Sequence, residues 1–287
     1  MLMLGFCVLV PFSDALAKYV GDSVPLGQMV FVRFATQAAI LAPLAFATGA
    51  GMRIGRRAFL LNALRTAFHV LAMALFFLSL RALPLADAVA ITFVMPFLLL
   101  FLGKLFLGET VGVRRLTACA AGFVGTLMVV RPSFIEVGAA ALLPLAVAGL
   151  FAGFVLTTRA VARHADPMAL QAINGAMGAA FLAPVMLVAG VVGPPDLGFA
   201  AAPASVWGLL VALGVFGTVA HLLMTWSLRF APAATLAPMH YLEIPFATLI
   251  GWLVFGDLPD GMAAAGIAVT MAAGLYVIHR ERIAAAG

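Results

Sequence analysis

The chain has 287 residues, of which 65% are hydrophobic and only 9% are charged. No water-soluble fold of this length could bury so much apolar surface. Runs of about 20 mostly apolar residues recur along the chain, and each could cross roughly 30 Å of hydrocarbon as a helix. The composition therefore indicates a polytopic membrane protein and excludes a soluble domain.

Short clusters of charged residues, Pro and Gly divide the apolar runs. They predict ten membrane-spanning helices, near residues 2–20, 27–48, 58–80, 86–107, 112–131, 138–160, 168–191, 206–229, 234–255 and 261–279. Cys7 and Cys119 both fall inside predicted helices, so we expect no disulfide framework. The predicted fold class is an all-α membrane protein.

The distribution of Lys and Arg predicts the orientation, because these residues stay preferentially on the cytoplasmic side. With the N-terminus inside, most of the 16 Lys and Arg residues fall in inner loops and the C-terminal tail. These are Arg53, Arg56, Arg57, Lys104, Arg114, Arg115, Arg159, Arg163, Arg229, Arg280 and Arg282. Only Lys18, Arg81 and Arg131 fall at outer ends, so both termini are predicted to be cytoplasmic. This bias also explains the net charge of +5, and no nucleic-acid partner is expected.

The second half of the chain repeats the first. The segment "SLRALPLADA" at 79–88 aligns with "SLRFAPAATL" at 227–236, and the same offset aligns "LGKLFLGE" at 102–109 with "IGWLVFGD" at 250–257. The predicted repeats are residues 1–137 and 138–287, within a single membrane domain. An odd number of helices in each repeat makes the second enter from the opposite face, so the repeats are inverted. Inverted repeats are typical of secondary transporters, whose substrate site lies near the midplane between the halves.

The sequence also resembles a known family. The segment "RALPLADAVAITFVMPFLLLFLGKLFLGETVGVRRLTACAAGFVGTLMVVRP" has a mid-helix proline, a Leu-Gly-Glu at a helix turn, and a Gly-rich helix ending in Arg-Pro. It resembles the first repeat of the EamA family in the drug/metabolite transporter superfamily. The segment "EIPFATLIGWLVFGD" resembles the second repeat, with Asp257 where the family more often has Glu. The resemblance spans essentially the whole chain and implies a ten-helix metabolite exporter of the bacterial inner membrane.

Within the family, size and layout are most similar to YddG-type exporters of aromatic and other neutral amino acids. Exporters of threonine and homoserine, exporters of cysteine derivatives and carriers of S-adenosylmethionine share the same frame, so these substrates stay alternatives, as does a channel-like facilitator. An intramembrane enzyme is not expected, since the sequence has no GxSxG, HExxH or paired-Asp motif and no Cys–His ligand spacing. We expect no cofactor and no metal. Alternating access is expected, while proton coupling and the choice between monomer and homodimer are open.

Polar side chains inside the apolar runs are site hypotheses, because a polar group in hydrocarbon is costly and usually faces the bundle interior. His69 lies at the centre of the helix predicted at 58–80; a bond to a neighbouring helix is the alternative, and the family resemblance favours a cavity-lining role. Thr218, His221 and Thr225 form a stripe on the helix at 206–229, where threonine bonding to its own helix is the alternative. The candidates for lining the substrate cavity are His69, Met73, Phe76, Thr92, Thr218, His221, Thr225 and Tyr241.

The helix predicted at 234–255 contains "MHYLEIPF", in which His240 and Glu243 are three residues apart and can meet on one face. A carboxylate near the middle of a membrane is costly unless it is paired. Glu243, modulated by His240, is therefore the candidate for proton coupling; capping of a broken backbone is the alternative. Pro96 and Pro245 interrupt corresponding helices of the two halves, which points to a binding site between them. We predict that both prolines kink their helices and act as the hinge of a gate.

The remaining buried polar residues receive structural interpretations. Asp14 and Lys18 are four residues apart and are predicted to form a local ion pair near the outer end. Arg33 is expected to extend its side chain to the outer interface. Gln171 and Asn174 are expected to bind neighbouring helices.

Overall fold

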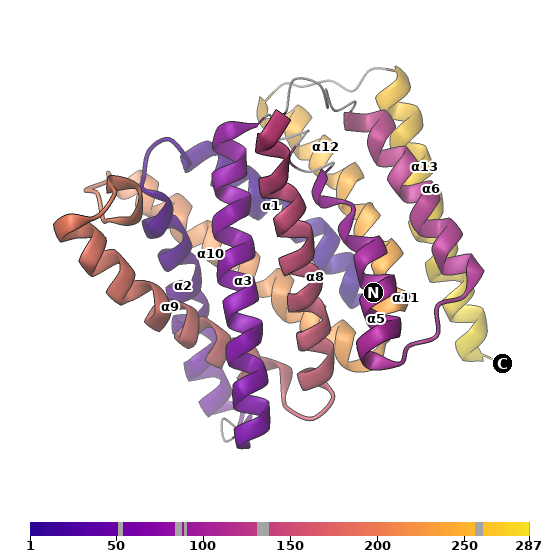
Figure 1. Cartoon of the computed structure of the whole chain (residues 1–287), viewed down its shortest axis with the longest axis horizontal. Helices are drawn as coiled ribbons and strands as arrows, with labels where there is room; N and C mark the ends of the chain where they lie inside the picture. Colours follow the sequence, from indigo (N-terminus) through magenta and orange to yellow (C-terminus); the bar gives the residue numbers. More distant parts are fainter. Residues whose placement is uncertain (51–53, 84–87, 89–90, 131–137, 256–260, 287) are drawn as a thin grey trace.

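The structure, a computed structural model, describes residues 1–287 except 51–53, 84–87, 89–90, 131–137, 256–260 and 287 (Figure 1). Arg53, Arg131 and Asp257 lie outside the described residues. Within the described ranges every regular element is a helix, as the sequence predicts. The elements are α1 (Leu2–Val20), α2 (Leu26–Ala47), α3 (Arg56–Ala82), α5 (Met95–Leu107), α6 (Val113–Val130), η1 (Gly138–Ala141), α8 (Leu142–Ala162), α9 (Pro167–Val192), η2 (Pro195–Leu197), α10 (Ala204–Phe230), α11 (Ala233–Leu236), η3 (Ala237–Leu242), α12 (Glu243–Phe255) and α13 (Gly261–Ala286).

Most of the long helices have the length and polarity of membrane spans. Among the described residues, six helices are long and apolar enough to cross a membrane: α1, α2, α3, α8, α9 and α10. Two shorter apolar stretches, Met95–Leu107 in α5 and Ala264–Tyr276 in α13, accompany them. The chain is therefore a multi-pass membrane protein, and the predicted bounds of these six spans agree with the observed ones to within a few residues.

Two predicted helices are broken where the sequence predicts kinks. Pro96 lies at the start of α5 instead of inside a longer helix, and a turn precedes it. The stretch predicted as one helix at 234–255 is divided into α11, η3 and α12, with Pro238 at the start of η3 and Pro245 in the first turn of α12. Proline lacks a backbone N–H, and the first turn of a helix is where none is needed. Each proline thus follows a break instead of bending a continuous helix.

The helices pack in pairs that link the two halves of the chain. α1 packs against α10 and α8 against α3, while α5 packs against α8 and α12 against α1. α2 pairs with α9 and α6 pairs with α13, at opposite sides of the bundle in Figure 1. Exchanging the helices of the first half for those of the second maps these pairs onto one another. The observed helix pairs are thus related by an exchange of the two halves of the chain.

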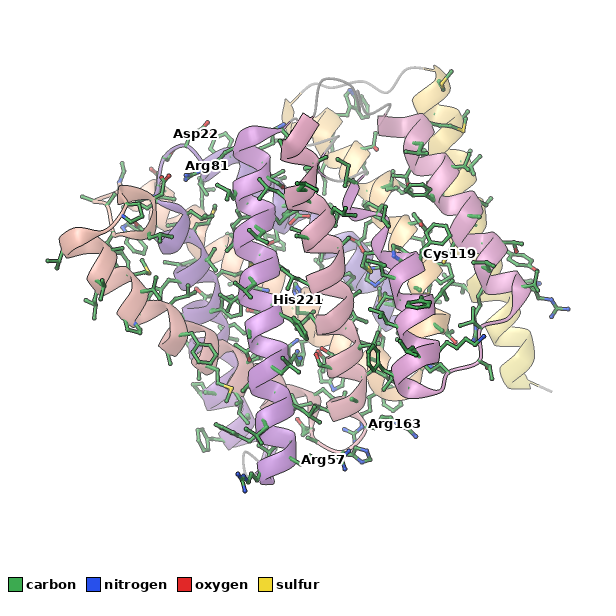
Figure 2. The ribbon with its side chains drawn as sticks, in the orientation of Figure 1. Asp22, Arg57, Arg81, Cys119, Arg163 and His221 are labelled. Atoms are coloured by element: carbon green, nitrogen blue, oxygen red, sulfur yellow. The ribbon has the colours of Figure 1, made fainter. Side chains whose placement is uncertain are left out.

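Charged side chains mark the two ends of the bundle. Figure 2 shows Arg57 and Arg163 at one end and Asp22 and Arg81 at the other, with His221 at a depth between them. His221 is 5% exposed. The bundle therefore has two polar ends. A site inside it is expected at the level of His221, between these ends.

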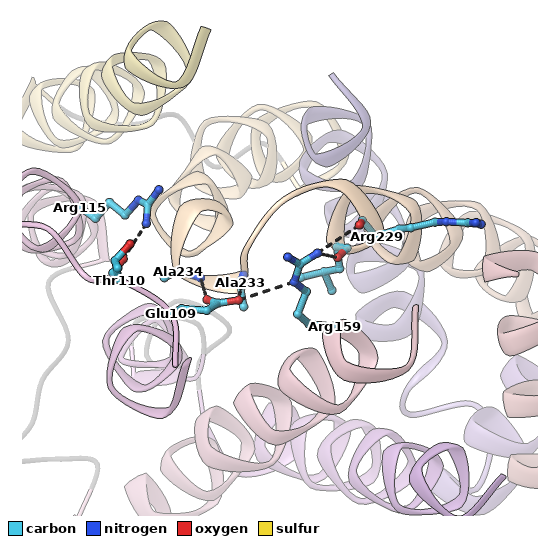
Figure 3. Close-up of polar contacts among 8 residues, drawn as sticks. Glu109, Thr110, Arg115, Arg159, Arg229, Ala233 and Ala234 are labelled. Carbon is cyan, nitrogen blue, oxygen red and sulfur yellow. Dashed lines mark hydrogen bonds and ion pairs between the residues drawn. The ribbon is translucent and has the colours of Figure 1, made fainter. Parts of the chain in front are cut away.

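The end of α5 is tied to three other helices by Glu109 (Figure 3). Its carboxylate accepts hydrogen bonds from the backbone N–H groups of Ala233, at 3.0 Å, and Ala234, at 2.8 Å, where α11 begins. Arg159, at the end of α8, lies 3.7 Å from the same carboxylate and donates to carbonyls in the last turn of α10. We call this arrangement the Glu109 corner. It stabilises the turn between α10 and α11, because a negative charge is favourable at a helix N-terminus and a positive one at a C-terminus.

The close packing of α6 on α13 generates a stability prediction. A Cβ atom added to Gly125 would lie 2.8 Å from the carbonyl oxygen of Gly266 on α13. Gly125→Val should therefore destabilise the protein by about 1–3 kcal/mol through overpacking. Thermal unfolding in detergent measures this effect. Gly149→Val, at a position on α8 with open space around it, is the matched control, and equal melting of the two variants would contradict the prediction.

Candidate functional site

A cavity of about 910 Å³, including its open mouth, lies inside the bundle. Its walls come from α1, α3, α8, α10 and α12 and from residues 92–95. The walls are mostly apolar, and they include the rings of Phe6, Phe76, Phe77, Phe93 and Phe151. Asp14, His69, Thr92, His221 and Glu243 are the polar side chains among the lining residues. A mostly apolar cavity with a few polar groups is typical of a site for a small organic molecule.

The sequence-predicted cavity residues divide into two groups in the structure. Those that line the cavity are His69, Met73, Phe76, Thr92 and His221. Thr218 lies outside it and donates to the carbonyl of Gly214, one turn earlier, at 2.6 Å, which is the alternative that we had considered for it. Tyr241 is also outside, and its hydroxyl donates to the carbonyl of Phe93 at 3.2 Å. Thr225 takes part in the hydrogen-bond network described below.

Sequence reasoning missed the face that α1 presents to the cavity. Phe6, Val10 and Asp14 all line it. The prediction gave Asp14 only a local partner, Lys18, and no place in a site. The four-residue spacing of these three side chains puts them on one face of a helix. That pattern, with an acidic residue among apolar ones, is the signal that could have identified Asp14.

Behind the cavity wall, buried polar side chains form a continuous hydrogen-bonded set, which we call the polar layer. Its members come from α2, α3, α8, α9 and α10. They are Arg33, Gln37, Asn62, Arg65, Thr66, His69, Thr158, Gln171, Asn174, His221 and Thr225. His69 and His221 belong both to the polar layer and to the cavity wall, so the layer and the cavity share a surface.

The expectation that Arg33 extends to the outer interface is wrong. The residue is 0% exposed, its Nη1 donates to Gln37 Oε1 at 3.0 Å, and its Nη2 lies 3.1 Å from His221 Nδ1. Gly217 on α10 makes room for this arrangement, because a Cβ atom there would overlap the guanidinium. Gln37 and His221 thus contact the two terminal nitrogens of the guanidinium inside the bundle, and this reduces the need to reach water.

A second guanidinium, that of Arg65, is held in the same way. Its Nε donates to Thr158 Oγ1 at 2.7 Å, and its Cζ lies 4.9 Å from the ring centroid of Phe154, which is a cation–π contact. In the part of the chain that the structure describes, neither Arg33 nor Arg65 has an acidic side chain at ion-pair distance. The layer therefore contains two positive charges that only neutral groups contact directly.

Gln171 and Asn174 of α9 connect the layer, which confirms the prediction that they bind neighbouring helices. Gln171 Nε2 donates to Thr225 Oγ1 on α10 at 2.8 Å. Asn174 Nδ2 donates to Thr66 Oγ1 on α3 at 2.8 Å. Both amides also accept from Gln37 Nε2 on α2, at 3.0 and 3.1 Å. One short segment of α9 thus fixes the positions of α2, α3 and α10.

His240 and Glu243 meet as their spacing predicts. The distance from His240 Nδ1 to Glu243 Oε1 is 2.7 Å. Glu243 lines the cavity, whereas His240 is buried behind it with its ring edge-on to Phe6, 5.5 Å between centroids. Glu243 is also the first residue of α12, directly after the broken segment. The pair therefore couples a cavity-lining carboxylate to a histidine inside the bundle.

Membrane-length helices around a central, largely apolar cavity define a multi-pass membrane protein with an internal cavity. The chain belongs to the EamA-like transporter family, which it matches over residues 1–131 and 138–279. This match confirms the family to which the sequence motifs pointed. The protein is therefore a small-molecule transporter of the drug/metabolite transporter superfamily.

Known transporters of several kinds are similar to this chain. It is 31% identical to a riboflavin transporter of Rhizobium johnstonii over 71% of this chain and 65% of that protein, so it spans slightly less than two thirds of that relative. It is 26% identical to the pseudopaline exporter CntI of Pseudomonas aeruginosa, over 88% of this chain and 86% of the exporter. It is 23% identical to an S-adenosylmethionine uptake transporter of Rickettsia felis, over 94% and 88%.

A solved crystal structure shares the fold. It superposes with a TM-score of 0.76 at 20% sequence identity and covers 94% of each chain. The arrangement of helices described above is thus one that an experimentally determined protein also adopts.

Two threonines on α10 test the polar layer. Thr225 Oγ1 accepts from Gln171 Nε2, whereas Thr218 bonds only within its own helix. Thr225→Val should destabilise the protein by about 1–3 kcal/mol, because the Gln171 amide loses a buried partner. Thr218→Val is the matched control and should cost much less. Thermal unfolding in detergent measures both, and equal losses would show that the layer does not stabilise the bundle.

Proposed function

We propose that this protein carries a small organic metabolite with an aromatic or apolar body across the bacterial inner membrane. The observation that carries the proposal is the cavity at the depth of His221, with five phenylalanine rings and few polar groups in its walls. The EamA-like family and the transporters among its relatives support transport over catalysis.

Aromatic and other neutral amino acids are the first proposed substrates, with export as the direction. Their side chains would pack against rings such as Phe6 and Phe151. Their ammonium group would find acceptors in Asp14 and Glu243, which are the acidic side chains of the cavity wall. Both parts of an amino acid therefore have complementary groups in one cavity.

A planar heteroaromatic substrate is the second candidate. The aromatic walls suit a flat ring system, and two relatives from Rhizobium johnstonii and Brucella anthropi are named riboflavin transporters. Threonine, cysteine derivatives and S-adenosylmethionine lack such a ring or carry more charge, and they rank below these two classes.

Alternating access between two inverted repeats is the proposed mechanism, with both termini in the cytoplasm. The exchange symmetry of the helix pairs supports the repeats. The location of Arg57 and Arg163 at one end supports that end as the cytoplasmic one. The Glu109 corner joins α5 of the first half to α8 and α11 of the second, close to the α8 end that carries Arg163. Opening toward the cytoplasm would have to separate these helices.

Transport by purified protein in liposomes tests the proposal. A panel of labelled aromatic and neutral amino acids and riboflavin should include at least one compound with saturable flux and counterflow. Unsaturable flux would instead indicate a channel-like facilitator. Transport of riboflavin and of no amino acid would select the second candidate, and no flux of any compound would contradict the proposed substrate classes.

Neighbouring residues on α3 provide a matched pair for the same assay. Ala72 lines the cavity, whereas Leu71 is 51% exposed on the outer surface of the bundle. Ala72→Phe should reduce flux at least about tenfold by filling the cavity, while Leu71→Phe adds a similar ring on the outside and should transport like the wild type. Equal flux through both variants would show that substrate passes elsewhere.

Proton coupling is proposed to act through Glu243 and His240. A partly buried carboxylate that lines the cavity and contacts a histidine at 2.7 Å can exchange a proton as the substrate leaves. Glu243→Gln should abolish the response of flux to an imposed pH gradient, whereas Asp22→Asn, at one end of the bundle, should preserve it. Flux in the two variants is compared with and without the gradient. A Glu243→Gln variant that still responds to the gradient would rule out this role.

A further inference from the structure

The polar layer sets the hydrogen-bonding character of His69. The side chain is 1% exposed, and it lines the cavity. Its Nδ1 lies 3.2 Å from Asn174 Oδ1, and its Nε2 has no partner among the described residues. Since Nδ1 is directed at α9, the unpartnered Nε2 is the ring nitrogen left for a molecule in the cavity. Whether Nε2 accepts or donates depends on which nitrogen carries the proton.

Arg33 decides the orientation of the first amide in the chain of hydrogen bonds. A guanidinium can only donate. Because Arg33 Nη1 lies 3.0 Å from the Gln37 side chain, the Gln37 oxygen must face it and Nε2 must face the other way. Gln37 Nε2 then donates to Asn174 Oδ1 at 3.1 Å.

Thr66 fixes the Asn174 amide independently. The Thr66 hydroxyl donates to the carbonyl of Asn62 at 2.7 Å, so its oxygen can only accept from Asn174, at 2.8 Å. Asn174 Nδ2 must therefore face Thr66, and Oδ1 must face Gln37 and His69. The contacts that begin at Arg33 and those that begin at Thr66 thus independently direct the Asn174 oxygen, an acceptor, at His69.

An acceptor at Asn174 Oδ1 requires the proton of His69 to be on Nδ1. In the neutral imidazole Nε2 then carries a lone pair and accepts. Arg33 contacts His221, which lies beside the His69 ring, and Arg65 lies over Phe154, which stacks on it, so two permanent positive charges close by disfavour a positively charged imidazole. Phe154 stacks on the ring at 4.3 Å between centroids and Phe34 contacts it edge-on at 5.0 Å, so its plane is also held.

The other polar groups of the cavity wall add to this acceptor character. Asp14 and Glu243 are acceptors when ionised, and Glu243 uses only Oε1 for His240. The Thr92 hydroxyl donates its proton to the carbonyl of Ala88 at 2.8 Å, so its oxygen is also left to accept. His221 is the exception: its Nδ1 has both the Gly217 carbonyl, at 2.9 Å, and the Arg33 guanidinium, at 3.1 Å, within reach, and its unpartnered Nε2 accepts in one tautomer and donates in the other.

We propose that this cavity selects its substrate by hydrogen-bond donors: a molecule with an aromatic or apolar body and at least one N–H or O–H group, which His69 Nε2 accepts. Aromatic acids that carry only a carboxylate are excluded from this contact with His69, because acceptor would face acceptor. The inference rests on the proposed function, since it assumes that the cavity is the substrate site. It adds that the substrate must carry a hydrogen-bond donor, and that a positive charge on the substrate is not enough for binding.

Four phenyl compounds of similar size separate donor from charge. Phenethylamine is a cation with N–H donors, and its N,N,N-trimethyl analogue is a cation without them. 2-Phenylethanol is a neutral donor, and 3-phenylpropionate is an anion without a donor at neutral pH. Binding to the purified protein in nanodiscs, measured by calorimetry, should be at least about tenfold weaker for the trimethyl analogue and for 3-phenylpropionate than for phenethylamine. 2-Phenylethanol should bind more tightly than 3-phenylpropionate.

Variants of His69 assign the selectivity to Nε2. His69→Gln extends an amide oxygen to about the position of Nε2 and should keep the preference for phenethylamine over its trimethyl analogue. His69→Asn retains a polar contact with Asn174 and has no atom at that position, so the preference should disappear. Leu71→Phe, on the outer surface of α3, is the control and should bind all four compounds like the wild type. Histidine-selective ¹⁵N NMR of the wild-type protein should show Nδ1 protonated and Nε2 unprotonated at His69.

The outcomes separate this inference from the proposed function. Equal binding of the amine and its trimethyl analogue, tighter binding of 3-phenylpropionate, or a proton on His69 Nε2 would each overturn donor selection and leave the cavity as the substrate site. No binding of any of the four compounds to well-folded protein would overturn both. If His69→Asn fails to fold, the comparison of compounds on the wild type and the NMR experiment still decide the question.

Discussion

The buried guanidinium of Arg33 is the constraint on which the rest of the interior depends. A permanent charge inside a membrane bundle is stable only where the protein replaces much of the hydration that it has lost. Gln37 accepts from one terminal nitrogen at 3.0 Å, His221 Nδ1 lies 3.1 Å from the other, and Gly217 provides the space. Since these groups come from α2 and α10, the two helices cannot slide or rotate past one another without leaving the charge exposed to hydrocarbon.

From Arg33 the same constraint spreads to the cavity. Because the Gln37 oxygen faces Arg33, Gln37 Nε2 donates to Gln171 and Asn174. The Asn174 oxygen is thereby directed at His69 as an acceptor. The cavity wall is therefore the outer surface of a structural network, and its chemistry is decided partly by residues that no substrate touches. The aromatic side of the cavity is different, because phenylalanine rings determine the shape of the cavity but have no hydrogen-bonding groups that could select a donor or an acceptor on a substrate.

The sequence alone predicts the parts of this structure that depend on one helix at a time. An apolar run of about 20 residues specifies a span whatever surrounds it, and an imidazole in such a run, as at His69, must face the interior. The direction of Arg33 could not be predicted in this way, since its partner His221 is 188 residues away along the chain. Extension to the interface is the best solution for an isolated helix, and a neighbouring helix offers a better one. Asp14 was missed for a similar reason. The face of α1 on which it lies becomes a cavity wall only because α3 and α12 pack around the same space.

The Glu109 corner has a consequence for the kinetics of the molecule. One carboxylate serves the N-terminus of α11 while the guanidinium in contact with it serves the C-terminus of α10, so four polar partners are satisfied together. Moving the end of α5 away from α8 and α11 would break the two hydrogen bonds of the Glu109 carboxylate and its ion pair with Arg159 together. Under the proposed alternating access, separation at this corner would therefore be cooperative, and its cost would be concentrated at a single point on the bundle's rim.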